Sequence, residues 1–315
     1  MIARLQKAIT LGLVTAALAW LLYWIRQGRP ILGGAGAGCL LLGHGLFLAT
    51  EFSLLVWVGA EKAGPQARPG SMVRAWWGEL AAAPLTFCWR QPFRSRIWPD
   101  RLPASARGRR GLLLVHGFVC NRGIWNAWLE RLARQGTAWI AVDLEPAFGS
   151  IDQYTPIIES AVRRLETACG VPPVIVAHSM GGLAVRRWWS TQQDPRRIHH
   201  LVTIATPHRG TWLARWAFST NARQMRCDSD WLKRLAHEES TDAPALCTCY
   251  YGDCDNIVFP AQRAIWPGAR AMRLEGVAHV AMVARDEPWL EVQRLLSDLP
   301  AGDADSQRVK PASSS

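Results

Sequence analysis

The fold of this chain is decided by the stretch VIVAHSMGG, residues 174–182. Its apolar first half is long enough for a fully buried strand, and its second half holds small residues that can begin a helix. Ser179 stands at the turn between them. At such a turn the strand and the helix approach so closely that the residues two positions from the serine must be small. Ala177 and Gly181 meet this requirement. The stretch therefore predicts a strand, a tight turn that presents a serine hydroxyl, and a helix.

Short apolar runs recur on both sides of this stretch and alternate with amphipathic segments. We predict strands near 111–116, 138–143, 173–177, 200–205, 246–251 and 271–275. Helices are predicted near 123–134, 153–168, 180–192 and 288–297. Strands that alternate with helices form a parallel sheet with helices on both faces. The predicted fold class is therefore α/β, with a mostly parallel sheet flanked by helices.

A serine at a strand-to-helix turn is a candidate nucleophile, the alternative being a serine that merely caps the helix. Acyl transfer also needs backbone amides aimed at the developing oxyanion. The run GLLLVHGF, residues 111–118, is a buried strand that ends in His-Gly. We expect the amides of Phe118 and Met180 to form this oxyanion hole. We expect His116 to bond the loop backbone and to take no part in the chemistry.

These segments resemble the α/β-hydrolase superfamily, and more narrowly the bacterial triacylglycerol lipases. The motif AHSMGG (177–182) is similar to that of the small Bacillus lipases, which also carry Ala where most members have Gly. The turn ATPHRGT (205–211) resembles the one that follows the strand after the nucleophile helix in those lipases. LEPAFGSI (144–151) resembles their segment after the preceding strand. The resemblance runs from residue 111 to about 298 and implies an α/β-hydrolase fold that cleaves carboxylic esters.

The resemblance also implies a Ser-His-Asp triad in the chain order serine, acid, histidine. Asp253 and Asp255 both stand in YYGDCDNIVFP, residues 250–260. The acid of the family usually precedes a Val by three positions, which favours Asp255 and leaves Asp253 as the alternative. His279, in GVAHVAM (276–282), matches the position of the catalytic base. Such a triad works through an acyl-enzyme and needs neither a metal nor an organic cofactor.

An apolar region precedes all of these motifs. Residues 8–25 carry no charge and are long enough to cross a bilayer. Their small residues run into Trp20 and further apolar residues, which disfavours a cleaved signal peptide. Residues 31–60 form a second apolar stretch, interrupted by Glu51, which is costly in hydrocarbon unless it faces a partner. We favour a hairpin of two transmembrane helices. The alternative is one span followed by a re-entrant or interfacial segment.

Glycines and basic residues in this region refine the prediction. Gly34, Gly36 and Gly38 would let the second helix pack closely on the first. The excess of Lys and Arg outside the short turn between the helices, weighed by the positive-inside rule, favours a catalytic domain in the cytoplasm. A single span would reverse this orientation. The expected location is the inner membrane of a bacterium.

The chain has 315 residues, 49% of them hydrophobic, which suits one large domain with an appended segment. Its formal net charge is +11, with arginines clustered between residues 90 and 110. Such a cluster suits anionic lipid headgroups, or it is a plain solvated linker. No nucleic-acid-binding motif accompanies the charge, so nucleic acid is not an expected partner. We divide the chain into a membrane anchor (1–60), a basic linker (61–110), a catalytic domain (111–299) and a disordered tail (300–315).

Two further features leave alternatives open. Cys247 and Cys249 alternate on a predicted strand and are expected to be small buried residues, although a disulfide from Cys227 to this group is possible in an oxidising compartment. Residues 212–236 are rich in aromatic side chains and are either a lid over the site or helices packed on the edge of the sheet.

The predicted function is hydrolysis of lipid or acyl esters. Acyl transfer, thioester or polyester hydrolysis by the same triad is the alternative, as is a non-catalytic scaffold tethered to the membrane.

Overall fold

The protein is described by a computed structural model that covers residues 1–60 and 67–298. Its centre is a six-stranded, wholly parallel sheet with the strand order β2-β1-β3-β4-β5-β6. The strands are β1 (Leu112–Val115), β2 (Trp139–Ala141), β3 (Val174–His178), β4 (His200–Ile204), β5 (Cys247–Gly252) and β6 (Arg270–Leu274). Each of them falls on one of the strands predicted from the sequence.

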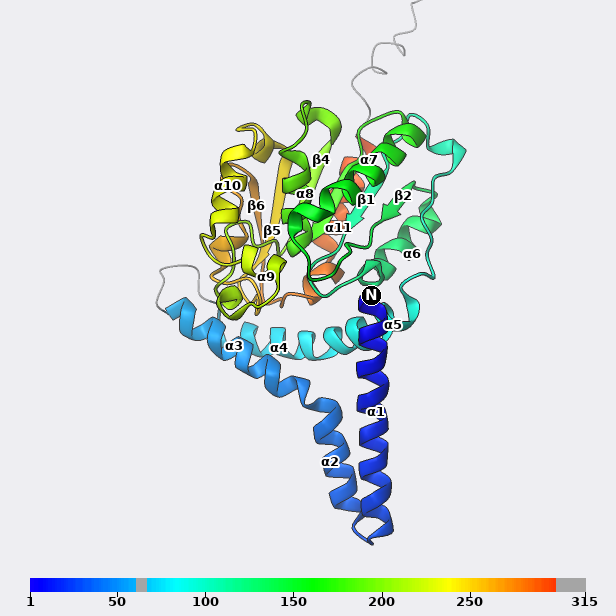
Figure 1. Ribbon diagram of the computed structural model, residues 1–315, viewed down its shortest axis with the longest axis vertical. Helices are drawn as coiled ribbons and strands as arrows, with labels where there is room; N and C mark the ends of the chain where they lie inside the picture. The colour runs from blue at the N-terminus through cyan, green and yellow to red at the C-terminus, as the bar shows by residue number, and fades with distance from the viewer. Residues whose placement is uncertain (61–66, 299–315) are drawn as a thin grey trace, which may run out of the picture.

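Helices cover both faces of the sheet (Figure 1). They are α6 (Asn126–Gln135), α7 (Thr155–Cys169), α8 (Met180–Trp189), α9 (Thr220–Gln224), α10 (Asp230–Glu238) and α11 (Asp286–Ser297). Successive strand residues point to opposite faces. Leu113 and Val115 therefore pack in one apolar layer with α7 and α8, while Leu112 and Leu114 pack in the other with α6 and α11. Because both of their faces are buried, β1 and most of β3 are apolar, whereas the edge strand β6 is largely exposed. The predicted α/β fold is confirmed.

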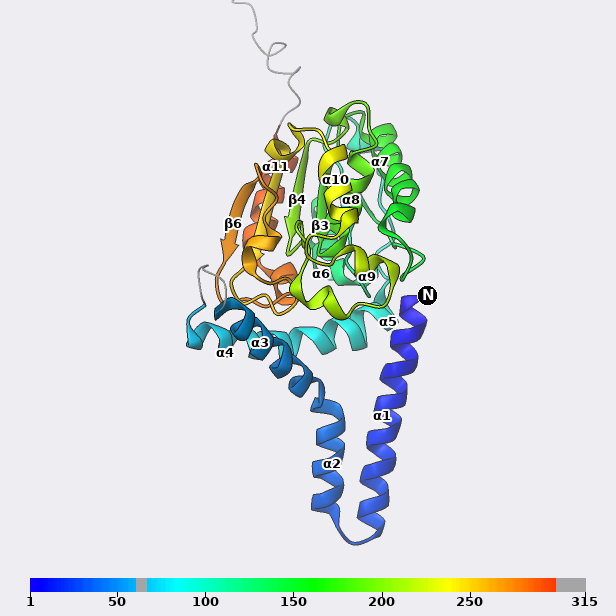
Figure 2. The same ribbon diagram turned by 60° about the vertical axis from the view of Figure 1, so that its left-hand side comes forward.

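Three helices make up the first 60 residues, namely α1 (Ile2–Arg26), α2 (Pro30–Leu42) and α3 (His44–Ala60). Figures 1 and 2 show α1 and α2 side by side, projecting away from the sheet domain. α1 is long and apolar enough to cross a membrane. α2 and α3 pass the same test only as a pair, and that pair is bent by 46°. The bend turns α3 back beneath the domain.

Glycines allow α1 and α2 to pack closely, but only one of the three predicted glycines takes part. A Cβ atom on Gly33 would lie 3.0 Å from the carbonyl oxygen of Leu21, and one on Gly36 would lie 2.0 Å from Nε1 of Trp20. Gly34 and Gly38, by contrast, face open space. The prediction that they allow close packing is wrong, because the helix turns them away from α1.

The prediction of a basic linker at residues 61–110 also needs correction. Its residues 61–66 lie outside the described part, but the rest is mostly helical. It contains α4 (Pro69–Pro84), a π-helical turn (Leu85–Arg90) and α5 (Gln91–Arg94). α4 lies across the base of the domain next to α3 (Figure 2). α4 buries Ala75 and Glu79 against the domain, so the segment is part of the folded unit. The predicted tail, 300–315, lies outside the described residues.

α3 and α4 join the domain through an apolar cluster of their own. Phe52 and Val58 of α3 and Ala75 of α4 pack there with Phe259 and Ala278. The last two residues belong to loops that follow β5 and β6. Because these strands are parallel, their carboxyl ends meet at one edge of the sheet. α3 and α4 therefore cover that edge.

Two smaller predictions concern cysteines and the aromatic segment. Cys247 and Cys249 are fully buried on β5 with their sulfur atoms 3.8 Å apart, as expected of small core residues. In residues 212–236, Trp231 is buried and donates its indole N–H to Asp152 at 3.0 Å. Phe218, however, is 86% exposed. The segment is thus packed on the domain at its helical end and open to solvent near Phe218.

Candidate active site

Ser179 lies at the turn between β3 and α8, as predicted. Its φ of 54° falls in the left-handed region, which a non-glycine residue rarely adopts. The glycines that follow explain how the turn closes. A Cβ on Gly181 would lie 2.5 Å from the carbonyl oxygen of His116, and one on Gly182 would lie 2.2 Å from Oγ1 of Thr206. Glycine at these two positions therefore allows α8 to start as close to its neighbours as the turn at Ser179 requires.

His279 and Asp255 lie in hydrogen-bond contact. Nδ1 of His279 is 2.9 Å from Oδ1 and 3.1 Å from Oδ2 of Asp255, and both side chains are buried. Oδ1 also accepts the backbone N–H groups of Ile257 at 2.9 Å and Val258 at 2.8 Å. Because an ionised carboxylate only accepts, Nδ1 carries the proton and Nε2 is left as the basic nitrogen. Burial lowers the pKa of His279, but the charge and hydrogen bond of Asp255 outweigh it and raise the pKa above its ordinary value.

Asp253, the alternative acid, makes different contacts. Its Oδ1 accepts the backbone N–H of Gly276 at 2.8 Å, and its Oδ2 lies 3.9 Å from the Arg273 guanidinium. Asp253 thus holds the start of the loop that carries His279 and does not bond its ring. Of the two carboxylates, Asp255 has the geometry that orients the imidazole.

Two loops converge around Ser179. His178, its neighbour, donates Nε2–H to the carbonyl oxygen of His279 at 3.3 Å, and the two rings lie 4.7 Å apart. Burial, together with the charge of His279, holds the pKa of His178 well below its ordinary value, so its ring is neutral. From the loop after β1, Gly117 approaches so closely that a Cβ on it would lie 2.7 Å from Cβ of Ser179. The serine therefore lies between the His279 loop and the Gly117 loop.

The two amides predicted for the oxyanion hole belong to the residue after Ser179 and to the residue after Gly117. Met180 is the first residue of α8, where backbone N–H groups have no partner within the helix. Phe118 follows Gly117 and is half-buried. His116 bonds backbone, as predicted, since its Nδ1–H donates to the Gly117 carbonyl at 2.8 Å and its Nε2 accepts from the Leu144 amide at 2.9 Å. This histidine fixes the loop that holds Phe118.

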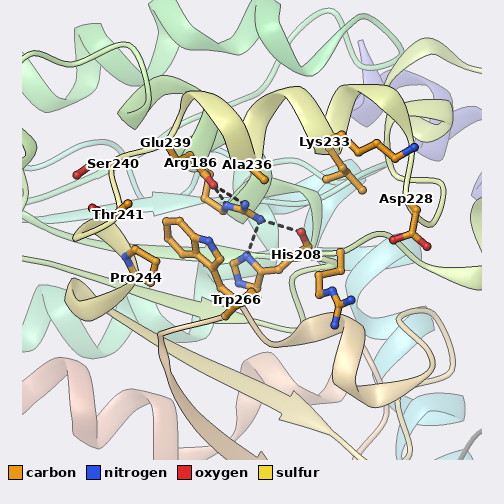
Figure 3. A pocket seen from close by; sticks show the side chains of 13 residues that line it. Arg186, His208, Asp228, Lys233, Ala236, Glu239, Ser240, Thr241, Pro244 and Trp266 are labelled. Carbon is orange, nitrogen blue, oxygen red and sulfur yellow. Dashed lines mark hydrogen bonds and ion pairs between the residues drawn. The ribbon is translucent and has the colours of Figure 1, made fainter.

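A cavity of about 410 Å³ lies beside α8 and α10 and is not lined by the predicted triad (Figure 3). Arg186 dominates it. Its guanidinium forms two 2.7 Å bonds to Glu239, donates to the His208 carbonyl at 2.9 Å, and stacks 4.4 Å from the centre of the Trp266 ring. Because these contacts pair Arg186 with Glu239, and no residue of the predicted triad lines the cavity, we interpret it as a structural ion pair under α10 and not as the reaction centre.

The chain belongs to the alpha/beta hydrolase family, whose model matches residues 112–302. Among curated proteins it is similar to the (lyso)-N-acylphosphatidylethanolamine lipases of Homo sapiens and Bos taurus, with 26% and 25% identity over 161 residues. Each match covers 46% of this chain and 42% of the lipase. The chain therefore spans about two fifths of the length of the curated relatives it matches.

Solved lipases share the fold. The mature lipase BlEst2 of Bacillus licheniformis is 15% identical and superposes with a TM-score of 0.53, over 63% of this chain and 94% of that one. Lipase B of Aspergillus fumigatus is 18% identical with a TM-score of 0.54, over 64% of this chain and 56% of that one. At this identity the likeness concerns the fold alone.

Several residues near the site were not singled out as site residues from the sequence. Glu79 of α4 accepts backbone N–H groups directly after His279, and Glu51 of α3 bonds Asn256, directly after Asp255. Gln6 of α1 donates to the carbonyl oxygen of Val119, next to Phe118, at 3.0 Å. The sequence contains one signal for these contacts. An acidic residue in an apolar helix needs a partner, and the partner of Glu51 is Asn256.

Proposed function

We propose that this protein is a serine hydrolase that cleaves carboxylic esters, with Ser179 as the nucleophile, His279 as the general base and Asp255 as the orienting acid. The observation that carries the proposal is the buried hydrogen bond from Nδ1 of His279 to Asp255. It leaves Nε2 as the basic nitrogen in a site whose serine stands at a glycine-closed turn.

The proposed reaction has two acyl-transfer steps. Oγ of Ser179 attacks the ester carbonyl carbon while its proton passes to Nε2 of His279. The amides of Phe118 and Met180 donate to the oxyanion, and the tetrahedral intermediate collapses to the acyl-enzyme as the imidazolium gives its proton to the departing alcohol. A water molecule, deprotonated by the same base, then releases the carboxylic acid and restores the serine hydroxyl.

Lipid or acyl esters are the substrates we propose. The curated relatives are named as lipases of (lyso)-N-acylphosphatidylethanolamine. The chain also exposes large apolar side chains on α3, on α4 and in the loop before α9, where a lipid surface could cover them. They include Trp57 of α3, Trp77 of α4 and Phe218.

We also propose that α1 anchors the protein in a membrane. Its 25 residues extend for about 38 Å, longer than the hydrocarbon core of about 30 Å. Apolar side chains along the helix are exposed, among them Ile9, Leu11, Leu18 and Leu22. A helix of a soluble core would bury them. Following the positive-inside rule, we place the domain in the cytoplasm; rapid digestion of the domain by protease added to spheroplasts would contradict this orientation.

The catalytic proposal is tested with p-nitrophenyl esters of graded chain length. The purified full chain and its Ser179→Ala variant are compared. We expect hydrolysis by the native protein, with a preference for longer acyl chains if lipid is the substrate, and a loss of at least about 1,000-fold in the variant. Equal rates from the two proteins would end the proposal.

A further inference from the structure

Two buried carboxylates lie beside the candidate site and have no part in the reaction proposed above. Glu79 of α4 is 2% exposed and Glu51 of α3 is 5% exposed. Both precede residue 112, where the match to the alpha/beta hydrolase family begins. A buried carboxylate is costly to desolvate unless hydrogen bonds compensate it, so the contacts of these two groups show what they stabilise.

Glu79 bonds the backbone directly after His279. Its Oε1 accepts the N–H of Val280 and its Oε2 accepts the N–H of Ala281, each at 3.0 Å. One carboxylate thus spans two successive amides and fixes the direction in which the chain leaves His279. Burial raises the pKa of Glu79, while these two bonds favour its ionised form.

Glu51 of α3 contacts the loop that carries Asp255. Its Oε2 accepts the side-chain N–H of Asn256 at 2.6 Å. Asn256, in turn, accepts the backbone N–H of His279 through Oδ1 at 3.2 Å. Because Asn256 follows Asp255 in the chain, this pair of bonds ties the loop of the acid to the loop of the base.

We propose that Glu79 is a positioning residue for His279, assisted by Glu51 acting through Asn256. We call these two glutamates the carboxylate clamp. The clamp makes α3 and α4 part of the active site, although they lie outside the segment that matches the family. The inference rests on the proposed function, since it concerns the base of the proposed triad.

The clamp also bears on the charge of His279. Burial lowers the pKa of His279, Asp255 raises it most among the partners, and the negative charges of Glu79 and Glu51 raise it further. The other charged or titratable groups around this loop are the neutral His178, Asp253, Arg273, the Cys254 thiol, whose pKa burial raises, and Arg74, whose guanidinium lies against Gly276. Neutralising Glu79 therefore lowers the pKa of His279 and moves the acid limb of the pH profile to lower pH.

The test compares Glu79→Gln with Glu79→Asp in the full chain, using a short soluble p-nitrophenyl ester. Gln places an amide N–H₂ against one of the two backbone N–H groups, so we expect kcat to fall about 10- to 100-fold with KM within about 3-fold. The acid limb should move to lower pH. Asp keeps the charge but is one methylene shorter, so kcat falls while the acid limb stays near that of the native protein. Glu130→Gln, an exposed charge on α6, is the matched control and should change neither.

Hydrogen exchange provides a readout that does not depend on catalysis. The amides of Val280 and Ala281 should exchange faster in Glu79→Gln than in the native protein. Unchanged kcat, pH profile and exchange in this variant would overturn the clamp while leaving the serine-hydrolase proposal intact. If Glu79→Gln does not fold, Glu51→Gln decides, since the clamp predicts a smaller loss of kcat and a smaller shift of the acid limb in the same direction. A native protein without Ser179-dependent hydrolysis would instead refute the proposed function, and the exchange rates would still test the clamp.

Discussion

Replacing Asp255 by Asn tests the orientation of the imidazole most sharply. In the native protein Oδ1 of Asp255 accepts the N–H groups of Ile257 and Val258, and Nδ1 of His279 lies 2.9 Å from Oδ1 and 3.1 Å from Oδ2. In the variant these two amides select the carbonyl oxygen of Asn for the Oδ1 position. The two amides then use both lone pairs of that oxygen, and the Asn N–H₂ group takes the Oδ2 position beside Nδ1. Two donors cannot bond each other, so the neutral imidazole shifts its proton from Nδ1 to Nε2.

The size of the effect follows from this change of tautomer. An imidazole protonated on Nε2 cannot take the proton of Ser179, and the corresponding change in a Ser-His-Asp protease costs about 10,000-fold in kcat. We expect a loss of that order in Asp255→Asn, with a folded protein, because the loop keeps its two backbone bonds. Steady-state assays with a p-nitrophenyl ester measure kcat. Thermal unfolding of the variant and the native protein shows whether the variant is folded.

Asp253→Asn is the matched control. Its oxygen can still accept the Gly276 amide, and it does not touch His279, so we expect kcat within about 10-fold of the native value. The reasoning is refuted if Asp253→Asn is as inactive as Asp255→Asn, or if Asp255→Asn keeps more than about a tenth of the native kcat.

Three more predictions follow from single contacts. Since the pKa of His279 is raised and the reaction needs its neutral form, the acid limb of kcat/KM should have its midpoint above about 6.5, and a midpoint clearly below that value would contradict the proposed field at the site. Gly117→Ala brings a methyl group within 2.7 Å of Cβ of Ser179. Because this displaces the serine, kcat for a p-nitrophenyl ester should fall about 100-fold. A kcat equal to that of the native protein would show that the loop can move aside without displacing Ser179. Arg186→Met leaves Glu239 buried without its partner and should cost about 3 to 5 kcal/mol in the free energy of unfolding, whereas a loss below about 1 kcal/mol in urea denaturation would mean that the pair is not buried in solution.

The sheet and the serine turn were predictable because their signals are local. Each strand is a short apolar run, and the turn at Ser179 needs glycines at fixed positions next to it in the sequence. The choice between Asp253 and Asp255 was harder. Both stand on one loop, and the path of that loop, fixed by the amides of Ile257 and Val258, decides which carboxylate meets His279.

The helices before residue 111 were harder still. The sequence shows that α2 holds several glycines but not which of them meet α1, because that depends on the rotation of the helix. Gly36 touches α1, whereas Gly34 and Gly38 do not. Glu79 is the single acid of α4. Its partners, Val280 and Ala281, lie some 200 residues further along the chain, and their amides carry no signal in the sequence.

The central claim is that Ser179 is a nucleophile activated by His279. A fluorophosphonate probe, which reacts with activated serines, followed by peptide mass spectrometry, tests it most directly. We predict that the probe modifies Ser179 in the native protein and that His279→Ala abolishes the modification. An unmodified native protein, or equal modification in the variant, would contradict the claim.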